Sequence, residues 1–432
     1  MIINAPAITL LLVSFLILLI IKVPIAFSLG LSTMVTALYL GIPPMVIGQQ
    51  MVKGLNSFSL IAIPFFIIAG EIMGEGGISE RLIKFSNVII GRLRGGLAMV
   101  NVLASMFFGG ISGSSVADTS SIGAIMIPMM EKQGYDKDFS VNVTITSSTQ
   151  GVIIPPSHNV IIYSLAAGGL SVGRLFLGGF LPGVLLGLAL MVLSYAVAVK
   201  RNYPKGERFS FKDGLKISLE SILGLFTAVI VIGGVTTGIF TATESAAIAA
   251  VYAFFITFFV YRDIPIKRMG KILRTSLKTL AMVLAVIATS SAFGYMMAYL
   301  KIPALVTETL ISISSNKYVI LIIVNMILLA LGMIMDMAPL ILITTPILLP
   351  VVTSVGMDPV QFGIVMMLNL GIGLITPPVG STLFVGCSIA GCKIEDVLKS
   401  LMPFYAVMFI MLLLLTFVPQ LTLFIPNLIM GQ

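Results

Sequence analysis

The stretch Gly109-Gly-Ile-Ser-Gly-Ser-Ser-Val-Ala-Asp118-Thr-Ser-Ser121 is polar and broken by glycine, and it lies between two apolar runs, 96–108 and 122–130. Because lipid offers the backbone no hydrogen-bond partner, such a segment is stable only where protein buries it or where it lines a cavity. A flanking helix of about 15 residues would be roughly 22 Å long, shorter than the hydrocarbon core of roughly 30 Å. The stretch therefore predicts a re-entrant hairpin whose tip stops near the middle of the membrane.

A constant spacing of 222 residues relates this region to a second one, because Pro155-Pro156 matches Pro377-Pro378 without a gap. The other matches at this spacing are Gly110 with Gly332, Pro128 with Pro350, Gly134 with Gly356, Asp136 with Asp358, and Gly151 with Gly373. The second hairpin is therefore predicted to turn at 332–339. In each half a further interrupted segment follows, at 146–157 and 369–378. Interrupted apolar segments at corresponding places in two halves point to the binding site of a secondary transporter.

The composition predicts a membrane protein with many spans, since 58% of the residues are hydrophobic, 10% are charged and the mean hydropathy is +1.12. We expect no soluble domain, and we interpret the apolar run 7–21 as a retained span and not as a signal peptide. The two cysteines lie in an apolar segment, which argues against a disulfide framework or a transition-metal site. Hydrolase and ATPase motifs are missing from the sequence, so we predict that the chain is not an enzyme. A channel stays open as an alternative.

The predicted fold is all-α, with two inverted repeats of five transmembrane helices, each repeat with a re-entrant hairpin and an interfacial arm helix. The first repeat covers 1–205, with its hairpin at about 96–130 and a broken helix at about 141–167. The second covers 206–432, with its hairpin at about 318–352 and a broken helix at about 360–391. The other predicted spans are 7–22, 24–41, 56–74, 176–199, 217–235, 243–261, 279–299 and 402–426. The amphipathic segments 78–93 and 303–316 are the predicted arms; an ordinary span with a few charges is the alternative for 78–93.

The distribution of positive charge predicts the orientation of the chain. With this set of spans, 21 of the 25 Lys and Arg residues lie on one side of the membrane, including six in 200–216 and six in 262–278. Since positively charged loops stay in the cytoplasm, both termini are predicted to lie outside.

Asp118 and Asp336 lie beside the two predicted tips. A carboxylate at the bilayer centre costs roughly 2.5–3.5 kcal/mol on insertion scales, so each needs a partner. Hydroxyl oxygens, and carbonyl oxygens freed at helix breaks, suit a small alkali cation. Because these oxygens outnumber titratable side chains near the tips, we expect sodium and not protons as the coupling ion. Alternatively, the hydroxyls only satisfy the helix breaks and each Asp caps a half-helix. The candidate cation ligands are Gly110, Ser112, Ser115, Asp118, Thr149, Gly151, Gly332, Asp336, Gly371, Gly373 and Thr376.

The residues after each Pro-Pro pair begin a new half-helix, whose N-terminus carries partial positive charge and favours an anion. The candidate substrate-binding residues are Ser114, Ser157, His158, Asn159, Gly380 and Ser381. His158, the single histidine, is equally well explained as a hydrogen-bonded structural residue. Glu71 and Glu244 lie near the ends of predicted spans, and we interpret them as structural.

Three motifs resemble the large membrane (permease) subunit of TRAP transporters, the DctM type: Phe108-Gly-Gly-Ile-Ser-Gly-Ser-Ser-Val-Ala-Asp118, Gly238-Ile-Phe-Thr-Ala-Thr-Glu-Ser245 and Thr376-Pro-Pro-Val-Gly380. The resemblance covers essentially the whole chain. It implies a sodium-coupled elevator in the cytoplasmic (inner) membrane of a bacterium or archaeon, importing an organic acid such as a C4-dicarboxylate or sialic acid. It places sodium ions near Ser112, Ser115, Gly332 and Gly373. In one departure from the family pattern, His158-Asn159 replaces an apolar pair after Pro-Pro-Ser.

The resemblance also implies two partners, a small four-span membrane subunit and a periplasmic substrate-binding protein. A physical argument agrees, because no soluble domain or long external loop is predicted that could capture the substrate. We also predict that the four spans at 7–41 and 217–261 form the scaffold for a moving hairpin domain, and a scaffold of this size is small enough that we expect a partner in the membrane. The alternative is a stand-alone cation-coupled dicarboxylate or citrate carrier of the DASS type, which would share the inverted hairpins.

Overall fold

The computed structural model describes residues 4–206, 210–314 and 316–431, and these residues form helices joined by short loops. The predicted all-α fold is confirmed. Up to residue 206 the helices are α1 (Ala5–Ile20), α2 (Ile25–Tyr39), α3 (Pro44–Leu55), α4 (Ala62–Glu75), α5 (Ile78–Ile90), α6 (Gly96–Ser112), α7 (Ser115–Asp118), α8 (Ala124–Lys132), α9 (Lys137–Ser148), α10 (His158–Ala166) and α11 (Val172–Lys200).

After residue 210 the helices are α12 (Phe211–Thr236), α13 (Ala242–Phe255), α14 (Met269–Tyr299), α15 (Ile302–Ile313), α16 (Lys317–Gly332), α17 (Met337–Ser354), α18 (Pro359–Leu374), α19 (Ser381–Ala390), α20 (Ile394–Phe417) and α21 (Gln420–Met430). Within the described ranges, six helices are long and apolar enough to cross a membrane, and the apolar pair α4 and α5 is bent by 70°. The remaining predicted spans contain apolar helices of 9 to 16 residues.

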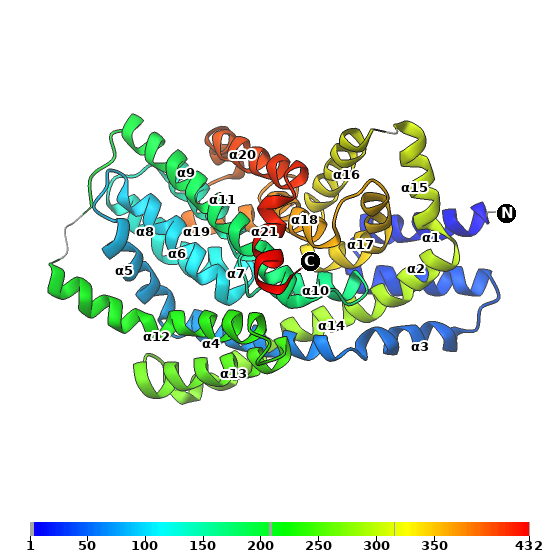
Figure 1. Cartoon of the computed structure of the whole chain (residues 1–432), viewed down its shortest axis with the longest axis horizontal. Helices are drawn as coiled ribbons and strands as arrows, with labels where there is room; N and C mark the ends of the chain where they lie inside the picture. Colours follow the sequence, from blue (N-terminus) through cyan, green and yellow to red (C-terminus); the bar gives the residue numbers. More distant parts are fainter. Residues whose placement is uncertain (1–3, 207–209, 315, 432) are drawn as a thin grey trace.

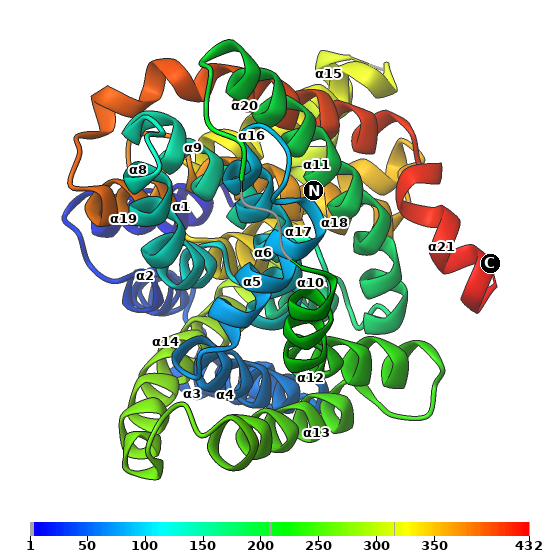
Figure 2. The ribbon, with the colours of Figure 1, turned by 90° about the vertical axis from the view of Figure 1, so that its left-hand side faces the viewer.

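Helices α3, α4, α12, α13 and α14 form one layer, which we call the scaffold layer. It runs along the lower part of Figure 1, and Figure 2, turned by 90°, shows it again at the bottom. In this layer α4 packs against α13, and α14 packs against α3 and α4. Helices α1 and α2 pack on each other, and α2 also contacts α14. The layer therefore differs from the predicted scaffold of 7–41 and 217–261, because it includes α4 and α14.

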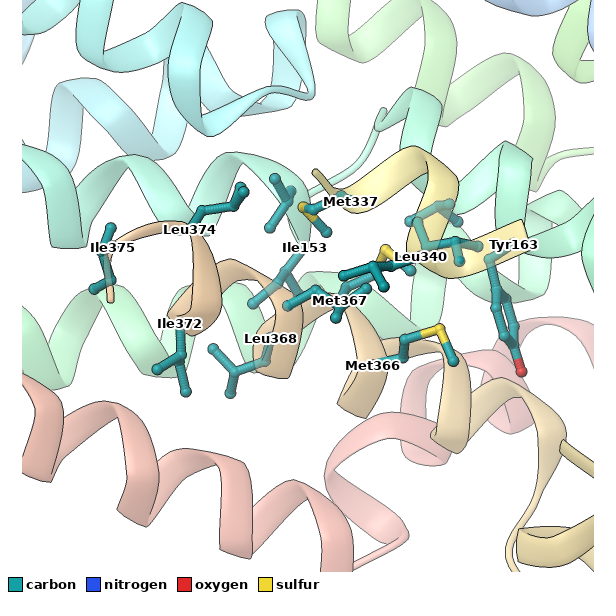
Figure 3. Close-up of a cluster of buried hydrophobic side chains, with 14 of the residues drawn as sticks. Ile153, Tyr163, Met337, Leu340, Met366, Met367, Leu368, Ile372, Leu374 and Ile375 are labelled. Atoms are coloured by element: carbon teal, nitrogen blue, oxygen red, sulfur yellow. The ribbon is translucent and has the colours of Figure 1, made fainter. Parts of the chain in front are cut away.

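The two hairpins and the two broken helices form the other part of the molecule, which we call the hairpin body (α6–α11 and α16–α21). It lies above the scaffold layer in Figure 1. Its core includes Ile153, Met337, Met366 and Leu368, which lie together in Figure 3 and are all at most 5% exposed. Tyr163 of α10 ties this core to the start of α18, since its hydroxyl donates to the carbonyl oxygen of Pro359 at 2.6 Å.

The predicted arm segments are helices, α5 and α15. Helix α5 packs on α12 of the scaffold layer and on α6 of the hairpin body, so it contacts both parts of the molecule. Helix α15 packs on α17 and touches α14. Both arms are therefore placed where they join the two parts.

Helix α3 has no counterpart among the predicted spans, because Gly48, Gln49, Gln50 and Lys53 dilute its apolar residues. It precedes α4 directly, and both pack along α14. A Cβ on Gly54 would lie 2.4 Å from Cβ of Ser291, so the contact with α14 requires glycine. The predicted span 56–74 is therefore preceded by an additional helix of the same layer.

Candidate functional site

The first hairpin turns at Gly113 and Ser114. Helix α6 ends at Ser112, and the N–H of Gly113 donates to the carbonyl oxygen of Gly109 at 2.9 Å. Gly113 has a φ of +62°, a left-handed conformation that favours glycine. A side chain there would also meet Ser157, since a Cβ would lie 2.9 Å from its Cα. Ser114 is extended and caps α7, its Oγ accepting from the N–H of Ala117 at 3.3 Å. Only Gly113 and Ser114 thus separate α6 from α7.

In each half, the first helix of the hairpin crosses the broken helix at a pair of glycines. A Cβ on Gly109 would lie 2.4 Å from Cα of Gly151, which is at the break between α9 and α10. A Cβ on Gly373 would lie 2.5 Å from the carbonyl carbon of Gly332. Since real Cβ atoms do not approach so closely, both crossings depend on backbone meeting backbone. Each crossing therefore places the backbone of one hairpin directly against the backbone of the broken helix in the same half.

The residues that follow the first Pro-Pro pair hold the first tip. The Nδ2 group of Asn159 donates to the carbonyl oxygen of Gly113 at 3.2 Å, and the ring of His158 hydrogen-bonds to the backbone of Ser112. The second tip is held by the equivalent segment through backbone only, as the N–H of Val379 donates to the carbonyl oxygen of Met333 at 3.2 Å. His158 and Asn159 therefore both hydrogen-bond to the backbone of the first tip.

Ser115 joins the first tip to both broken helices. Its hydroxyl lies 2.8 Å from the Oγ of Ser148 in α9 and 3.1 Å from the Oγ1 of Thr382 in α19. Ser148 in turn donates to the carbonyl oxygen of Ile145 at 2.8 Å. Since all three hydroxyls are buried, this chain of bonds fixes the first tip against the second half of the protein.

The two candidate aspartates lie in different surroundings. Asp118 ends α7 and is fully buried, next to the hydroxyl of Ser105 and the buried side chain of Thr119. No described Lys or Arg makes an ion pair with it. Asp336 is exposed and caps α17 without a side-chain hydrogen bond. The structure thus brings Asp118, and not Asp336, into the buried group of hydroxyls.

The remaining candidates are spread along the helix breaks. Thr149 donates to the carbonyl oxygen of Thr146 at 2.7 Å, and Thr376 donates to that of Ile372 at 2.6 Å, so both hydroxyls satisfy breaks in their own helices. Gly371 packs near Thr149. Gly380 is left-handed with a φ of +48° and begins α19. The hydroxyls of Ser157 and Ser381 are buried without a hydrogen-bond partner among the described residues. Gly110 lies against the carbonyl of Pro155.

A cavity of about 740 Å³ lies between α4 of the scaffold layer and the first hairpin. Three predicted site residues line it, Ser112, Ser114 and His158, together with Glu71 of α4. The other lining residues are Phe66, Ile67, Gly70, Gly74, Glu75, Phe108, Val116, Ala117, Ser120, Ser121 and Thr279. A volume of this size is typical of a small-molecule site. Sequence reasoning interpreted Glu71 as structural; the helical spacing of Gly70, Glu71, Gly74 and Glu75, which puts small and acidic residues on one face, is the signal that could have found it.

A second cavity of about 480 Å³ continues from the first, since both are lined by Gly74, Glu75 and Ser121. It leads to the ion pair between Arg81 and Asp263, whose atoms are 2.5 Å apart. Lys84 also lines it. The site between the hairpin and α4 therefore opens toward the end of the molecule where charged residues gather.

Ion pairs at that end join four separate segments. Glu75 contacts Arg268 and Lys271, each at 3.1 Å. Arg201 contacts Asp136 at 2.8 Å and Asp138 at 3.1 Å. Burial favours the protonated form of Asp138, but hydrogen bonds from Arg201 and Ser400 outweigh this effect and lower its pKa. All these residues belong to segments that the distribution of Lys and Arg predicts to lie on the cytoplasmic side of the membrane.

The chain matches the profile of the family described as "Tripartite ATP-independent periplasmic transporter, DctM component" over residues 12–421. It is 38% identical to the C4-dicarboxylate TRAP transporter large permease protein DctM of Vibrio cholerae, over 95% of this chain and 96% of that protein. It is 37% identical to the sialic acid TRAP transporter large permease protein SiaM of the same organism, over 89% of this chain and 90% of that protein.

The fold is similar to the crystal structure of the YdaH transporter of Alcanivorax borkumensis, with a TM-score of 0.61 and 12% identity over 85% of this chain and 86% of that one. This likeness concerns the fold alone. The family match covers almost the whole chain and agrees with the two permeases, which confirms the resemblance and the prediction of a transporter and not an enzyme. The chain belongs to the DctM family, the large permease components of the tripartite ATP-independent periplasmic transporters.

Proposed function

We propose that this chain carries an organic acid across the cytoplasmic membrane, together with sodium, through the cavity between α4 and the first hairpin. The observation that carries the proposal is the position of that cavity. It is bounded by Ser112 and Ser114 at the tip, while Ser115 and Asp118 of the same hairpin are buried directly behind it. Relatives named for a C4-dicarboxylate and for sialic acid support an organic acid as substrate.

The buried residues of the first hairpin fit a sodium ion. Asp118 is a fully buried carboxylate without a cationic partner among the described residues, and burying an isolated carboxylate is costly. The hydroxyl of Ser105 lies beside it and the buried Thr119 follows it in the chain, and hydroxyl and carboxylate oxygens are ligands that hard cations take. Ser115, Asp118 and the backbone near Gly110 and Gly151 would hold the ion in the first half. Gly332 and Gly373 would contribute carbonyls in the second.

Sodium and substrate are coupled, in this proposal, because both depend on the position of one tip. Ser112 and Ser114 face the cavity, and Ser115 follows them on the buried side. An ion that holds Ser115 and Asp118 in place thereby also positions the two hydroxyls that meet the substrate. Without the ion, the unpaired carboxylate favours a rearranged tip, and the substrate loses its partners.

The division into a scaffold layer and a hairpin body supports an elevator. The substrate cavity lies at the boundary between them, and α5 packs on both. Movement of the hairpin body past α4 would carry the site from one side of the membrane to the other. The second cavity continues toward Arg81 and Asp263, so with both termini outside this arrangement would give access from the cytoplasmic side.

The orientation with both termini outside is supported by the ion pairs among 75–81, 136–138, 201 and 263–271, which gather the predicted cytoplasmic segments at one end. In Figure 1 helix α1 lies toward the opposite end of the molecule from α5 and α8. Cysteine labelling of intact cells tests this orientation. A single cysteine at position 205 or 268 should be protected from an impermeant reagent and one at 169 should react; the reverse result would refute the proposal.

The proposed partners are a small membrane subunit and a periplasmic binding protein, as for the family. The test is uptake into vesicles that contain this chain with and without the two partners, and with sodium or proton gradients imposed separately. We expect uptake only with the complete set and a sodium gradient. Full uptake of free acid by this chain alone would favour the stand-alone carrier, and uptake driven by a proton gradient alone would refute sodium coupling.

A further inference from the structure

The two walls of the substrate cavity have opposite hydrogen-bonding character. At the tip, the Oγ of Ser112 accepts from the N–H of Ser114 at 3.4 Å, and the Oγ of Ser114 accepts from the N–H of Ala117 at 3.3 Å. Because each oxygen already accepts a bond from the backbone, each hydroxyl keeps its hydrogen to donate. The tip wall therefore offers donors, which is what a carboxylate requires.

The opposite wall, on α4, offers acceptors. Glu71 is half-buried and lines the cavity. An ionised carboxylate accepts hydrogen bonds and donates none. Glu75 lies one turn further along the same face, but Arg268 and Lys271 already occupy both of its oxygens, at 3.1 Å each. Glu71 makes no ion pair with a described residue, although Lys271 attracts it and Glu75 repels it at longer range. The oxygens of Glu71 can therefore accept hydrogen bonds from whatever occupies the cavity.

No Lys or Arg is among the residues that line this cavity in the described part of the chain. A substrate with a carboxylate at each end would therefore set one of them against Glu71 without a compensating cation. At short range inside a protein, two such like charges repel strongly. A substrate with hydroxyls at that end would instead donate charge-assisted hydrogen bonds to Glu71, which are stronger than bonds between neutral groups.

We propose that Glu71 is a specificity-determining residue that selects a singly charged, hydroxylated acid, such as a sugar acid, over a dicarboxylate. The inference rests on the proposed function, because it takes the cavity as the substrate site. The carboxylate of the substrate meets Ser112 and Ser114, and its hydroxyls face Glu71. Specificity arises from both an attraction to the hydroxyls and a repulsion of a second carboxylate.

The test measures binding directly, because a periplasmic binding protein would impose its own selection during uptake. The full chain is purified in sodium buffer, and its thermal unfolding is followed with three acids of equal chain length: gluconate, with hydroxyls along its chain, hexanoate, without them, and adipate, with a second carboxylate. Gluconate should stabilise the wild-type protein at a concentration on the order of tenfold lower than either other acid.

Glu71→Gln should abolish this preference, weakening gluconate and strengthening adipate by on the order of tenfold each. Glu71→Asp, which keeps the charge, should retain the order of the three acids. Glu75→Gln should have a smaller effect, because two cations already balance that carboxylate. Glu244→Gln is the matched control outside the cavity, where the carboxylate caps α13 by accepting from the N–H of Thr241 at 2.8 Å, and its preferences should equal the wild type.

Adipate binding as tightly as gluconate in the wild type, or an unchanged order in Glu71→Gln, would overturn the inference and leave the proposed function standing. Equal binding of hexanoate and gluconate would remove the role of the hydroxyls and overturn it as well. If none of the acids changed the unfolding temperature of any variant, the proposed substrate site itself would be refuted, and the inference with it.

Discussion

The first hairpin turns at Gly113 and Ser114 among buried hydroxyls, whereas the second turns at 333–336 and ends in an exposed aspartate. At the spacing of 222 residues, Asp336 corresponds to Ser114, and both residues are the N-caps of the returning helix. Asp118 corresponds to Leu340, which is buried. Positions that correspond at this spacing therefore carry different side chains. An acidic residue near a tip indicates a buried site only when its position on the helix is known.

The largest expected effect separates the two aspartates. Asp118→Asn should raise the sodium concentration for half-maximal uptake about a hundredfold or more, since removing the partner of a buried charge costs about 3–5 kcal/mol. Asp336→Asn should change it by no more than about twofold, because surface substitutions are mostly within about 0.5 kcal/mol. Uptake at graded sodium concentrations by the reconstituted complex measures both. Equal effects would contradict the distinction between the two tips.

The next effect compares the glycine crossings. Gly109→Ala should lower stability by about 1–3 kcal/mol, because its Cβ would overlap the backbone of Gly151. Gly332→Ala should cost less, since the Cβ would lie 3.3 Å from Cα of Gly373. Thermal unfolding of the purified variants measures the difference. Gly294→Ala is the control, because a Cβ there meets no atom within 4 Å and alanine favours the helix; a loss of stability in the control equal to that of Gly109→Ala would refute the steric explanation.

A smaller effect should follow from loosening the first tip. Asn159→Ala removes the bond to the carbonyl of Gly113 and should cost about 1 kcal/mol. The second tip offers no comparable side chain in its bond between Val379 and Met333, so Ser381→Ala, the equivalent substitution, should leave it unchanged. Hydrogen exchange at the two tips distinguishes them. Faster exchange around Met333 in Asn159→Ala would show that the bond does not act locally.

The smallest effect compares Asp136 and Asp358, which follow the two hairpins. Asp358 accepts from the N–H groups of Val360 and Gln361, so Asp358→Ala should cost about 1 kcal/mol, as for other N-caps. Asp136 makes no such cap bond; it accepts from Tyr203 and Arg201 while its side chain is 57% exposed. Asp136→Ala should therefore cost less than about 1 kcal/mol, and the cost should shrink with added salt. Unfolding at low and high salt measures this; a salt-dependent cost for Asp358→Ala instead would reverse the assignment.

The tips and the two helix breaks could be predicted from the sequence because glycine marks them locally, whereas the contacts between hairpin and broken helix could not. Gly113 and Ser114 lie inside the quoted polar stretch, and the match of Gly151 with Gly373 marks the two breaks where the hairpins cross. The buried position of Asp118 could not be predicted in this way. It depends on which side of the hairpin the residue faces. Asp118 and Asp336 were paired because both lie near a tip, and nearness to a tip does not show which side a residue faces.

The sequence could mark a polar face on α4, but it could not show that this face meets the first hairpin. Glu71 lies 41 residues before Ser112, and nothing local shows that the two line one cavity. Helix α3 was missed because Gly48, Gln49, Gln50 and Lys53 dilute its apolar residues, and its place in the layer depends on the close contact of Gly54 with Ser291. Both depend on packing between segments far apart in the chain, which periodicity within one segment does not reveal.

The packing of α4 between partners from the other half has a consequence for how the protein is made. Helix α4 packs against α13 and α14, and α14 also packs against α2 and α3. When the ribosome has completed the first half, these early helices are in the bilayer but their neighbours have not been synthesised. The first half is therefore in the membrane before its contacts with α13 and α14 can form. The cavity wall that carries Glu71 is fixed in place only after α14 has been inserted.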